Sequence, residues 1–175
     1  MIAALVLAAG EASRFGSPKQ ELLLPRVLDR IRDSSVSDIV VVLGAYEMEV
    51  TGARSVRCSG WQNGPGASLR CGAAALGPDV EAAVVCLADG PQLSSAAIDR
   101  VVAAWRGGAG DFVAASYDGV RSHPVVVARA LWPEIPDDGG RALEPVLVPC
   151  DDLGAPGDVD TPQDLENLER LERRP

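Results

Sequence analysis

The sequence lacks several features that would mark particular classes of protein. Its formal net charge is −9, so no basic stripe is available to attract DNA or RNA through counterion release, and we expect no nucleic-acid partner. No apolar run approaches the roughly 20 residues that cross a bilayer, and no basic residues precede the apolar start as in a signal peptide. We therefore expect a cytoplasmic chain with no membrane partner.

Cysteine and histidine are too sparse for a metal cluster. The four cysteines form no CxxC pair, and Cys86 lies inside an apolar run, so we interpret them as reduced thiols. His123 is the only histidine, which excludes a zinc site built on several histidines.

Short apolar runs alternate along the chain with segments of helical character. Runs that are hydrophobic on both faces suit strands covered by helices on both sides of a sheet. The expected strands are residues 2–8, 39–43, 82–88 and 112–115, and the expected helices are residues 26–32, 69–76 and 96–105, opened by Pro25, Ser68 and Ser94 with Ser95. This order predicts a single α/β domain over residues 1–175, with three α/β/α layers around a mainly parallel, Rossmann-like sheet.

Two further elements are expected towards the C-terminus. Residues 125–127 suggest one more strand, antiparallel to the others. Residues 161–173 suggest an amphipathic closing helix, with Thr161 as its cap and Pro162 at its first position.

The segment after the first expected strand contains glycines and cations. It runs from Leu7 to Lys19 as LAAGEASRFGSPK, and ligands of open α/β sheets bind beyond the carboxyl ends of strands. Gly10 and Gly16 allow backbone amides to approach a ligand, while Arg14 and Lys19 suit phosphate oxygens. The spacing fits neither a Walker A loop nor GxGxxG. From the residues alone, a phosphate-binding loop and a surface turn with two solvated cations both remain open.

This loop resembles the LAAGxSxRxGxxK motif of the MobA-like nucleotidyltransferases. The matching residues are Leu7, Ala8, Ala9, Gly10, Arg14, Gly16 and Lys19, while Ala12 replaces the family's first serine. The resemblance implies a fold of the nucleotide-diphospho-sugar transferase type. It also implies that the loop backbone holds the base and phosphates of a nucleoside triphosphate, and that Arg14 and Lys19 neutralise the phosphates.

A second block, GWQNGPGASLRCG, is similar to the WxxGxxxSLRxG segment of the molybdenum cofactor cytidylyltransferase branch. The matching residues are Trp61, Gly64, Ser68, Leu69, Arg70 and Gly72, and Cys58 stands where that branch commonly has asparagine. A glycine-rich turn leading into a helix offers free amides to an anion or a base carbonyl, which makes Gly64 and Ser68 candidate nucleotide ligands. For Ser68 alone, capping of the helix is the preferred interpretation, and packing explains Trp61 equally well.

Asp89 directly follows the apolar run of residues 82–88, so it should emerge at the ligand-binding edge of the sheet. A carboxylate there suits Mg²⁺, which usually takes only one or two protein carboxylates. The alternative is a turn formed with Gly90 and Pro91. The similar family segment is LADxPxV, with a larger residue where this chain has Gly90.

The C-terminal motifs suggest a second metal ligand and contacts to an acceptor. GDVDTPQDL is similar to DIDTPEDL, which makes Asp160 a candidate metal ligand and Asp158 a weaker one, although this segment also suits a helix cap. SHPVVV and DDGGR resemble segments that shape the acceptor site, so His123 and Arg141 are candidate acceptor contacts. A structural role for His123 beside Pro124 and a solvated Arg141 remain equal alternatives.

The reaction that the resemblance implies is attack by a phosphate monoester oxygen on the α-phosphorus of a nucleoside triphosphate, with release of pyrophosphate. Because that nucleophile is already anionic, Arg14, Lys19 and Asp89 with Mg²⁺ are expected to act by positioning and charge neutralisation. LAAG rather than LAGG, together with the SLRxG block, favours CTP and a molybdopterin acceptor, with a molybdoenzyme-maturation protein as partner. The alternatives are a GTP-dependent or sugar-phosphate nucleotidyltransferase and a non-catalytic nucleotide-binding protein that delivers a cofactor. Gly90 and the stretch after Pro25, which is shorter than in the family, motivate the last alternative.

Overall fold

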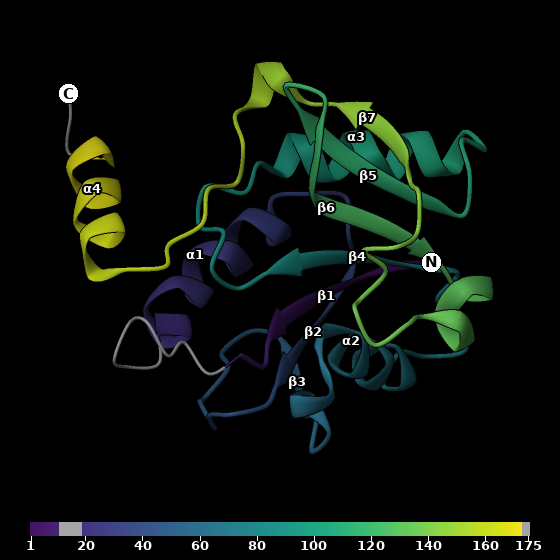
Figure 1. The fold of residues 1–175 in the computed structure, drawn as a ribbon, viewed down its shortest axis with the longest axis horizontal. Coiled ribbons are helices and arrows are strands. Elements are labelled where there is room, and N and C mark those ends of the chain that lie inside the picture. Colours follow the sequence, from purple (N-terminus) through teal and green to yellow (C-terminus); the bar gives the residue numbers. More distant parts are fainter. Residues whose placement is uncertain (11–18, 173–175) are drawn as a thin grey trace.

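The computed structural model describes residues 1–10 and 19–172 and contains a seven-stranded sheet between helices (Figure 1). The strands are β1 (Ile2–Ala8), β2 (Asp38–Leu43), β3 (Arg54–Arg57), β4 (Ala82–Leu87), β5 (Phe112–Tyr117), β6 (Val120–Ala128) and β7 (Val146–Pro149). Their order in the sheet is β3-β2-β1-β4-β6-β5-β7, and only β6 runs antiparallel to its neighbours. The predicted α/β class is confirmed, together with the antiparallel strand expected at residues 125–127.

Helices cover both faces of this sheet and form the predicted three layers. Helices α1 (Lys19–Arg32) and α3 (Ser95–Arg106) lie on one face and α2 (Pro65–Ala74) lies on the other, while α4 (Pro162–Glu172) lies outside these layers. The buried side chains of α1 and α3 form one core with one face of the strands, and those of α2 form another core on the opposite face. Alternate strand residues supply the two cores, because successive side chains of a strand point to opposite faces.

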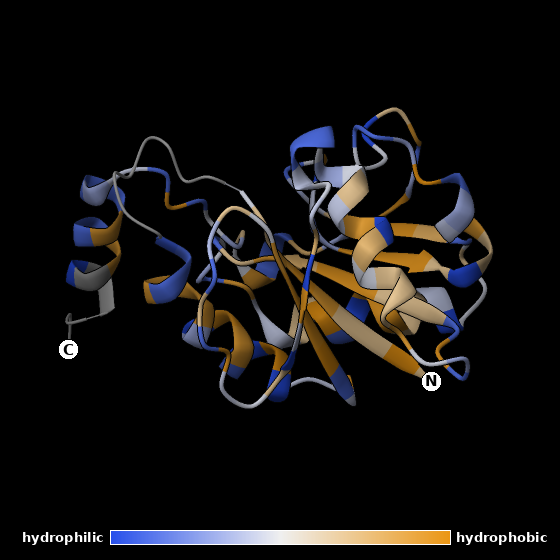
Figure 2. Cartoon of the chain, turned by 90° about the horizontal axis from the view of Figure 1, so that it is seen from below, coloured by the Kyte–Doolittle hydropathy of each residue, from blue (hydrophilic) through white to orange (hydrophobic). Residues whose placement is uncertain are grey.

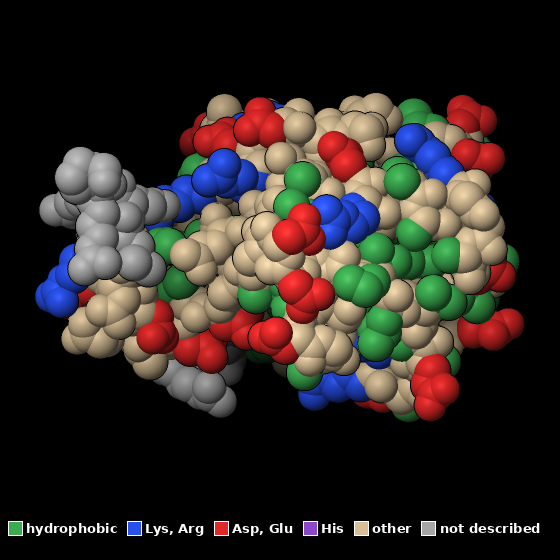
Figure 3. All heavy atoms as spheres, turned by 90° about the horizontal axis from the view of Figure 1, so that it is seen from above, with side chains coloured by type: hydrophobic (Ala, Val, Ile, Leu, Met, Phe, Trp, Pro, Cys, Tyr) green, Lys and Arg blue, Asp and Glu red, His purple; other side chains and the backbone are tan. Residues whose placement is uncertain are grey.

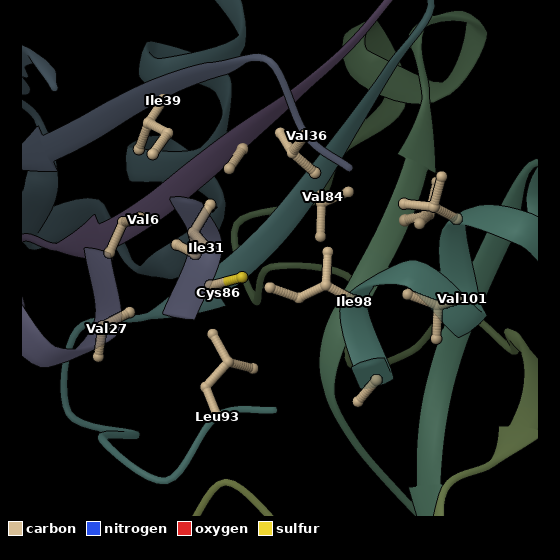
Figure 4. Close-up of a cluster of buried hydrophobic side chains, with 14 of the residues drawn as sticks. Val6, Val27, Ile31, Val36, Ile39, Val84, Cys86, Leu93, Ile98 and Val101 are labelled. Carbon is tan, nitrogen blue, oxygen red and sulfur yellow. The ribbon is translucent and has the colours of Figure 1, made fainter. Parts of the chain in front are cut away.

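The core beneath α1 and α3 is built from aliphatic side chains of both helices and of the central strands. In Figure 4, Val27 and Ile31 of α1 and Ile98 of α3 lie over Val6 and Val84. All five side chains are buried. This packing fixes where β1 and β4 end, and therefore where the segments after them begin.

Helix α1 begins at Lys19, well before the start predicted at Pro25. Pro25 lies inside the helix on its exposed side, while Leu23, Leu24, Val27 and Leu28 are buried. The buried positions keep helical spacing across the proline. Burial of this apolar side therefore outweighs the backbone hydrogen bond that a proline inside a helix cannot donate.

Helix α2 also begins earlier than predicted. Gly64 is its N-cap residue and Pro65 its first residue, a position that suits the fixed φ of proline. Ser68 lies one turn inside the helix and is buried. The preferred interpretation of Ser68 as the cap is therefore wrong.

Helix α4 lies apart from the sheet (Figure 1), and its Leu165 and Leu168 belong to a small hydrophobic cluster with Leu23 of α1. Its hydrophobic side faces the body of the molecule (Figure 2), where Leu168 and Val159 contact Leu23. Thr161 caps the helix as predicted: its Oγ1 accepts a hydrogen bond from the Asp164 amide at 3.3 Å, and Asp164 accepts one from the Thr161 amide at 2.8 Å.

Side chains of both charge signs are mixed on the face of the molecule shown in Figure 3. Hydrophobic side chains gather there toward the end away from α4. Among the described residues on this face, basic side chains form no continuous stripe. Within residues 1–10 and 19–172, the helices are too short or too polar to span a membrane.

Candidate active site

Lys19 joins the end of the predicted phosphate loop to both predicted metal carboxylates. Its side chain is buried, and Nζ lies 2.7 Å from the Val159 carbonyl oxygen, 3.0 Å from Asp160 Oδ1 and 3.1 Å from Asp89 Oδ2. Burial by itself lowers the pKa of Lys19, but the hydrogen bonds and charges of Asp160 and Asp89 outweigh it and raise the pKa above its usual value. The ammonium therefore stays charged inside the folded protein.

The two carboxylates reach Lys19 from distant parts of the chain. Asp89 lies in a turn directly after β4, and Asp160 lies just ahead of α4. The Val159 amide donates a hydrogen bond to the Asp89 carbonyl at 3.1 Å, so the segment before α4 is tied to the end of β4. The turn suggested for Asp89 is present, and its side chain is nevertheless available to Lys19. The Asp160 carboxylate likewise faces Lys19, whereas Thr161 and Asp164 form the helix cap.

These two carboxylates fit a divalent cation. Because their oxygens lie within about 3 Å of one ammonium nitrogen, they converge on one position. Residues 1–10 and 19–172 contain no group of three or more His, Cys, Asp or Glu side chains placed to hold a metal ion. Mg²⁺ needs only one or two protein carboxylates, since water and phosphate oxygens complete its shell.

Asp158 adds a third carboxylate close to this cluster. Partial burial raises its pKa, and the negative charges of Asp89 and Asp160 raise it further against the pull of Lys19. Asp158 also lines a neighbouring pocket, which lies over the carboxyl ends of β1 and β4. The cluster and the pocket therefore share one wall.

The pocket has a volume of about 480 Å³ and an apolar floor. Leu7 of β1, Leu69 of α2, and Val85 and Leu87 of β4 form this floor. Its polar lining comes from Arg121, Ser122, His123, Asp138, Arg141 and Asp158. The structure thus brings the predicted acceptor residues His123 and Arg141 together with Leu7 of the predicted nucleotide loop.

His123 forms part of the pocket wall as a neutral imidazole. Burial and the positive charge of Arg121 lower its pKa to about 4, although Asp89 acts in the opposite direction. A neutral imidazole can donate or accept a hydrogen bond but gives an acceptor phosphate no charge. Two arginines are among the described residues that line the pocket, and of these Arg141 has the exposed side chain.

Arg121 is a pocket residue that the sequence analysis missed. Its guanidinium donates hydrogen bonds to the carbonyl oxygens of Gly140 and Leu143, each at 3.0 Å, and stacks 4.7 Å from the centre of the Phe112 ring. Arg121 therefore anchors the loop that carries Arg141. The sequence could have indicated Arg121, because it lies two residues before His123 and residues two apart in a strand share one face of the sheet.

A second anchor joins this loop to the start of α2. The Gly66 amide donates to the Asp137 carbonyl at 3.0 Å, and Arg70 donates to the Ile135 carbonyl at 2.5 Å and to Asp137 Oδ1 at 2.6 Å. A Cβ at Gly64 would lie 2.5 Å from the Asp137 carbonyl oxygen, and one at Gly66 would overlap the Pro136 carbonyl. The two glycines therefore allow the segments to approach each other.

These contacts correct the expectation of free amides at the start of α2. The Gly64 amide donates to the Trp61 carbonyl at 3.2 Å, and the Ala67 amide donates to the Gly64 carbonyl at 3.2 Å. The Gly66 amide donates to the Asp137 carbonyl. All three amides already have backbone partners. Arg70, which belongs to the matched SLRxG segment, likewise has its hydrogen-bond partners in the loop.

The predicted nucleotide loop is described only at its two ends. Ala8 and Ala9 are buried, and the Gly10 carbonyl accepts a hydrogen bond from Gln20 Nε2 at 3.0 Å. Arg14, Gly16 and Ala12 lie outside the described residues, so the role of Arg14 stays a prediction. Ser68 is buried within α2, and its neighbour Leu69 lines the pocket.

Gly90, where the family segment has a larger residue, also lines the pocket. A Cβ at Gly90 would lie 3.3 Å from the Gly157 carbonyl oxygen and 3.4 Å from Pro156 Cβ. The segment leading to Asp158 thus packs directly on Gly90. A larger side chain at this position would push that segment away.

The chain is similar in sequence and in fold to known proteins. The family model described as MobA-like NTP transferase domain matches residues 4–148, a range that ends before Asp158 and Asp160. Rv0371c from Mycobacterium tuberculosis H37Rv is 27% identical, with a TM-score of 0.78 and 97% of each chain covered. A manganese complex of Rv0371c is 26% identical, with a TM-score of 0.75 and 99% of each chain covered.

More distant structures share the fold. Molybdopterin-guanine dinucleotide biosynthesis protein A from Archaeoglobus fulgidus is 17% identical, with a TM-score of 0.70 and 98% of each chain covered. A search of curated protein sequences gave no match.

Proposed function

Because the chain belongs to the MobA-like NTP transferase family, we propose that this nucleotidyltransferase moves a nucleoside monophosphate, preferentially from CTP, to a phosphorylated acceptor such as molybdopterin and releases pyrophosphate. The observation that supports the proposal best is the convergence of Lys19, Asp89 and Asp160 beside a pocket of about 480 Å³. Sequence motifs far apart in the chain meet there at the carboxyl edge of the sheet.

In this proposal Asp89 and Asp160 hold a divalent cation, Mg²⁺ in the cell. The bound cation would neutralise part of the triphosphate charge. The Lys19 ammonium pairs with both carboxylates in the absence of ligands. When the cation binds the carboxylates, the ammonium would pair with phosphate oxygens instead. Arg14 is proposed as the second phosphate cation. Leu7, Ala8, Ala9 and Gly10 would line the nucleotide side.

The acceptor would bind in the pocket against the wall that β6 and the loop after it form. Arg141 provides positive charge for the acceptor phosphate, and the neutral His123 provides a hydrogen bond. No general base is needed, because a phosphate monoester is already an anionic nucleophile. The Asp158 carboxylate suits an acceptor that also carries N–H or O–H groups, a property that pterins and sugar phosphates share.

The alternative acceptors and nucleotides are separated by one experiment. Pyrophosphate release is measured with Mg²⁺ or Mn²⁺ for each of the four nucleoside triphosphates, against molybdopterin and a panel of sugar phosphates. We expect turnover with CTP and molybdopterin, and its loss in Asp89→Asn. Turnover only with a sugar phosphate or with GTP would replace the proposed substrate. Binding of a nucleotide without turnover of any pair would instead support a non-catalytic cofactor-delivery protein.

A further inference from the structure

Cys58 and Cys71 lie near each other between the end of β3 and α2, 13 positions apart in sequence. Cys58 directly follows Arg57, the last residue of β3, and Cys71 lies within α2. The Cys71 thiol contacts the Arg57 carbonyl oxygen at 3.7 Å, and the Cys58 thiol contacts the Ala67 carbonyl oxygen at 3.5 Å.

Each thiol therefore lies against the backbone beside the other cysteine. Arg57 is the neighbour of Cys58, and the Ala67 carbonyl is the α-helical hydrogen-bond acceptor of the Cys71 amide. Burial raises the pKa of the Cys71 thiol to about 11, and a hydrogen bond with Cys58 and the charge of Cys58 act in the same direction.

The other two cysteines have no access to solvent. Cys86 and Cys150 are 0% exposed, and Cys58 is 4% exposed, whereas Cys71 is half-buried. From this arrangement we infer that Cys58 and Cys71 form a dithiol modification site, which closes to an intramolecular disulfide by exchange with a small disulfide such as oxidised glutathione.

The exchange takes two steps. The Cys71 thiolate, which is the more accessible, attacks one sulfur of oxidised glutathione, so that a mixed disulfide forms and one glutathione leaves as a thiolate. The Cys58 thiolate then attacks the Cys71 sulfur and releases the second glutathione. The two cysteine thiols lose their protons and are oxidised together by two electrons, and one glutathione disulfide is reduced to two thiols.

The disulfide would connect the edge of the sheet to the helix that borders the pocket. Leu69 of α2 forms part of the pocket floor, and Gly66 and Arg70 anchor the loop that carries Arg141. Oxidation of the two cysteines would therefore constrain α2, the helix that supplies part of the pocket floor and anchors the loop of Arg141.

The test needs no catalytic assay and therefore does not depend on the proposed function. The full chain is incubated with oxidised glutathione, alkylated and digested with trypsin without reduction. Cleavage after Arg57 and Arg70 places the two cysteines in separate peptides, residues 58–70 and 71–100. We expect these peptides to be joined with the loss of two hydrogen atoms, and fragmentation to locate the bond at Cys71 rather than Cys86.

Because closing this loop constrains the unfolded chain, we also expect the thermal midpoint to rise by roughly 5–10 °C. The Cys71→Ser variant should show neither the link nor the shift. The Cys58→Ala variant should stop at a glutathione adduct on Cys71. The inference is overturned if the wild-type chain keeps free thiols, stops at an adduct on Cys71, links Cys86 or Cys150, or forms the link without a rise in the midpoint.

Discussion

Replacing Arg70 with methionine should loosen the acceptor side of the pocket and leave the nucleotide side nearly unchanged. Methionine keeps most of the side-chain length but removes both hydrogen bonds to the loop after β6. The part-buried bond to the Ile135 carbonyl is charge-assisted and contributes about 1.5–3 kcal/mol. The ion pair with Asp137 is largely exposed and contributes at most about 1 kcal/mol.

The loop should therefore lose about 2 kcal/mol of its attachment, which corresponds to roughly a 30-fold shift toward detached conformations. The Gly66 amide and Arg121 remain as anchors, so detachment should be partial. We expect the KM for the acceptor to rise about tenfold, while the nucleotide affinity changes less than twofold. Amide hydrogen exchange of residues 135–141 should also accelerate by an order of magnitude.

The measurements are equilibrium titration with a fluorescent nucleotide, steady-state kinetics with the acceptor that turns over, and hydrogen exchange read by mass spectrometry. The Asp137→Ala variant is the matched control, because it removes only the exposed ion pair and should change each quantity little. A tenfold loss of nucleotide affinity in Arg70→Met with an unchanged acceptor KM would refute this reasoning, since it would show that Arg70 binds the triphosphate.

Three further predictions follow from the site. Asp89→Asn should lower turnover at least about 100-fold, measured as pyrophosphate release, because it removes a charge from the proposed cation site; its thermal midpoint should stay within a few degrees of wild type, and a large drop would point to a structural role. Gly66→Ala should lower the free energy of unfolding by about 1–3 kcal/mol in urea, since its Cβ overlaps the Pro136 carbonyl; an unchanged value would contradict that close packing. Folding lowers the pKa of His123 from 6.5 to about 4, so the unfolded chain binds more protons between these pH values. The free energy of unfolding should therefore fall by about 3 kcal/mol as the pH drops through that window. Urea unfolding at pH 7 and pH 4 should show a smaller loss in His123→Gln, and equal losses would exclude burial of a neutral imidazole.

The sequence predicted the interior of the sheet well because its strands are apolar on both faces. β1 has the predicted bounds, and β2, β4 and β5 differ from the predictions by one or two residues at either end. β3 and β7 were not predicted. Both are short edge strands, and most of their side chains are exposed, so neither carries the hydrophobic pattern on which the prediction depended.

Local signals predicted the starts of α3 and α4 but not those of α1 and α2. Ser94 is the N-cap residue of α3 and Thr161 caps α4, as predicted. Proline and serine favour the first residues of helices, but Pro25 and Ser68 both lie inside longer ones. In α1 the apolar spacing on both sides of Pro25 carried the correct information. In α2 the cap is a glycine, which its positive φ of 104° and its close contact with the Asp137 carbonyl both explain.

Motif matching located the members of the candidate site but not their connections. Lys19 and Asp160 are 141 positions apart in sequence, and no local pattern indicates that one ammonium contacts both Asp160 and Asp89. The anchoring roles of Arg70 and Arg121 were hidden for the same reason. Their partners are mostly backbone carbonyls, which any sequence provides.

The arrangement around Lys19 explains how an acidic chain can keep such a site formed before its ligands bind. Asp89, Asp158 and Asp160 would repel one another at close range, and the single buried ammonium offsets only part of that charge. Three carboxylates against one ammonium leave the cluster net negative, which attracts a divalent cation. In the proposed function, a cation held by the carboxylates would release the ammonium beside the pocket, where a triphosphate would need a counter-charge. The proposal therefore gives one lysine two roles: its ion pairs hold the empty site together, and its ammonium would bind the phosphates of the occupied one.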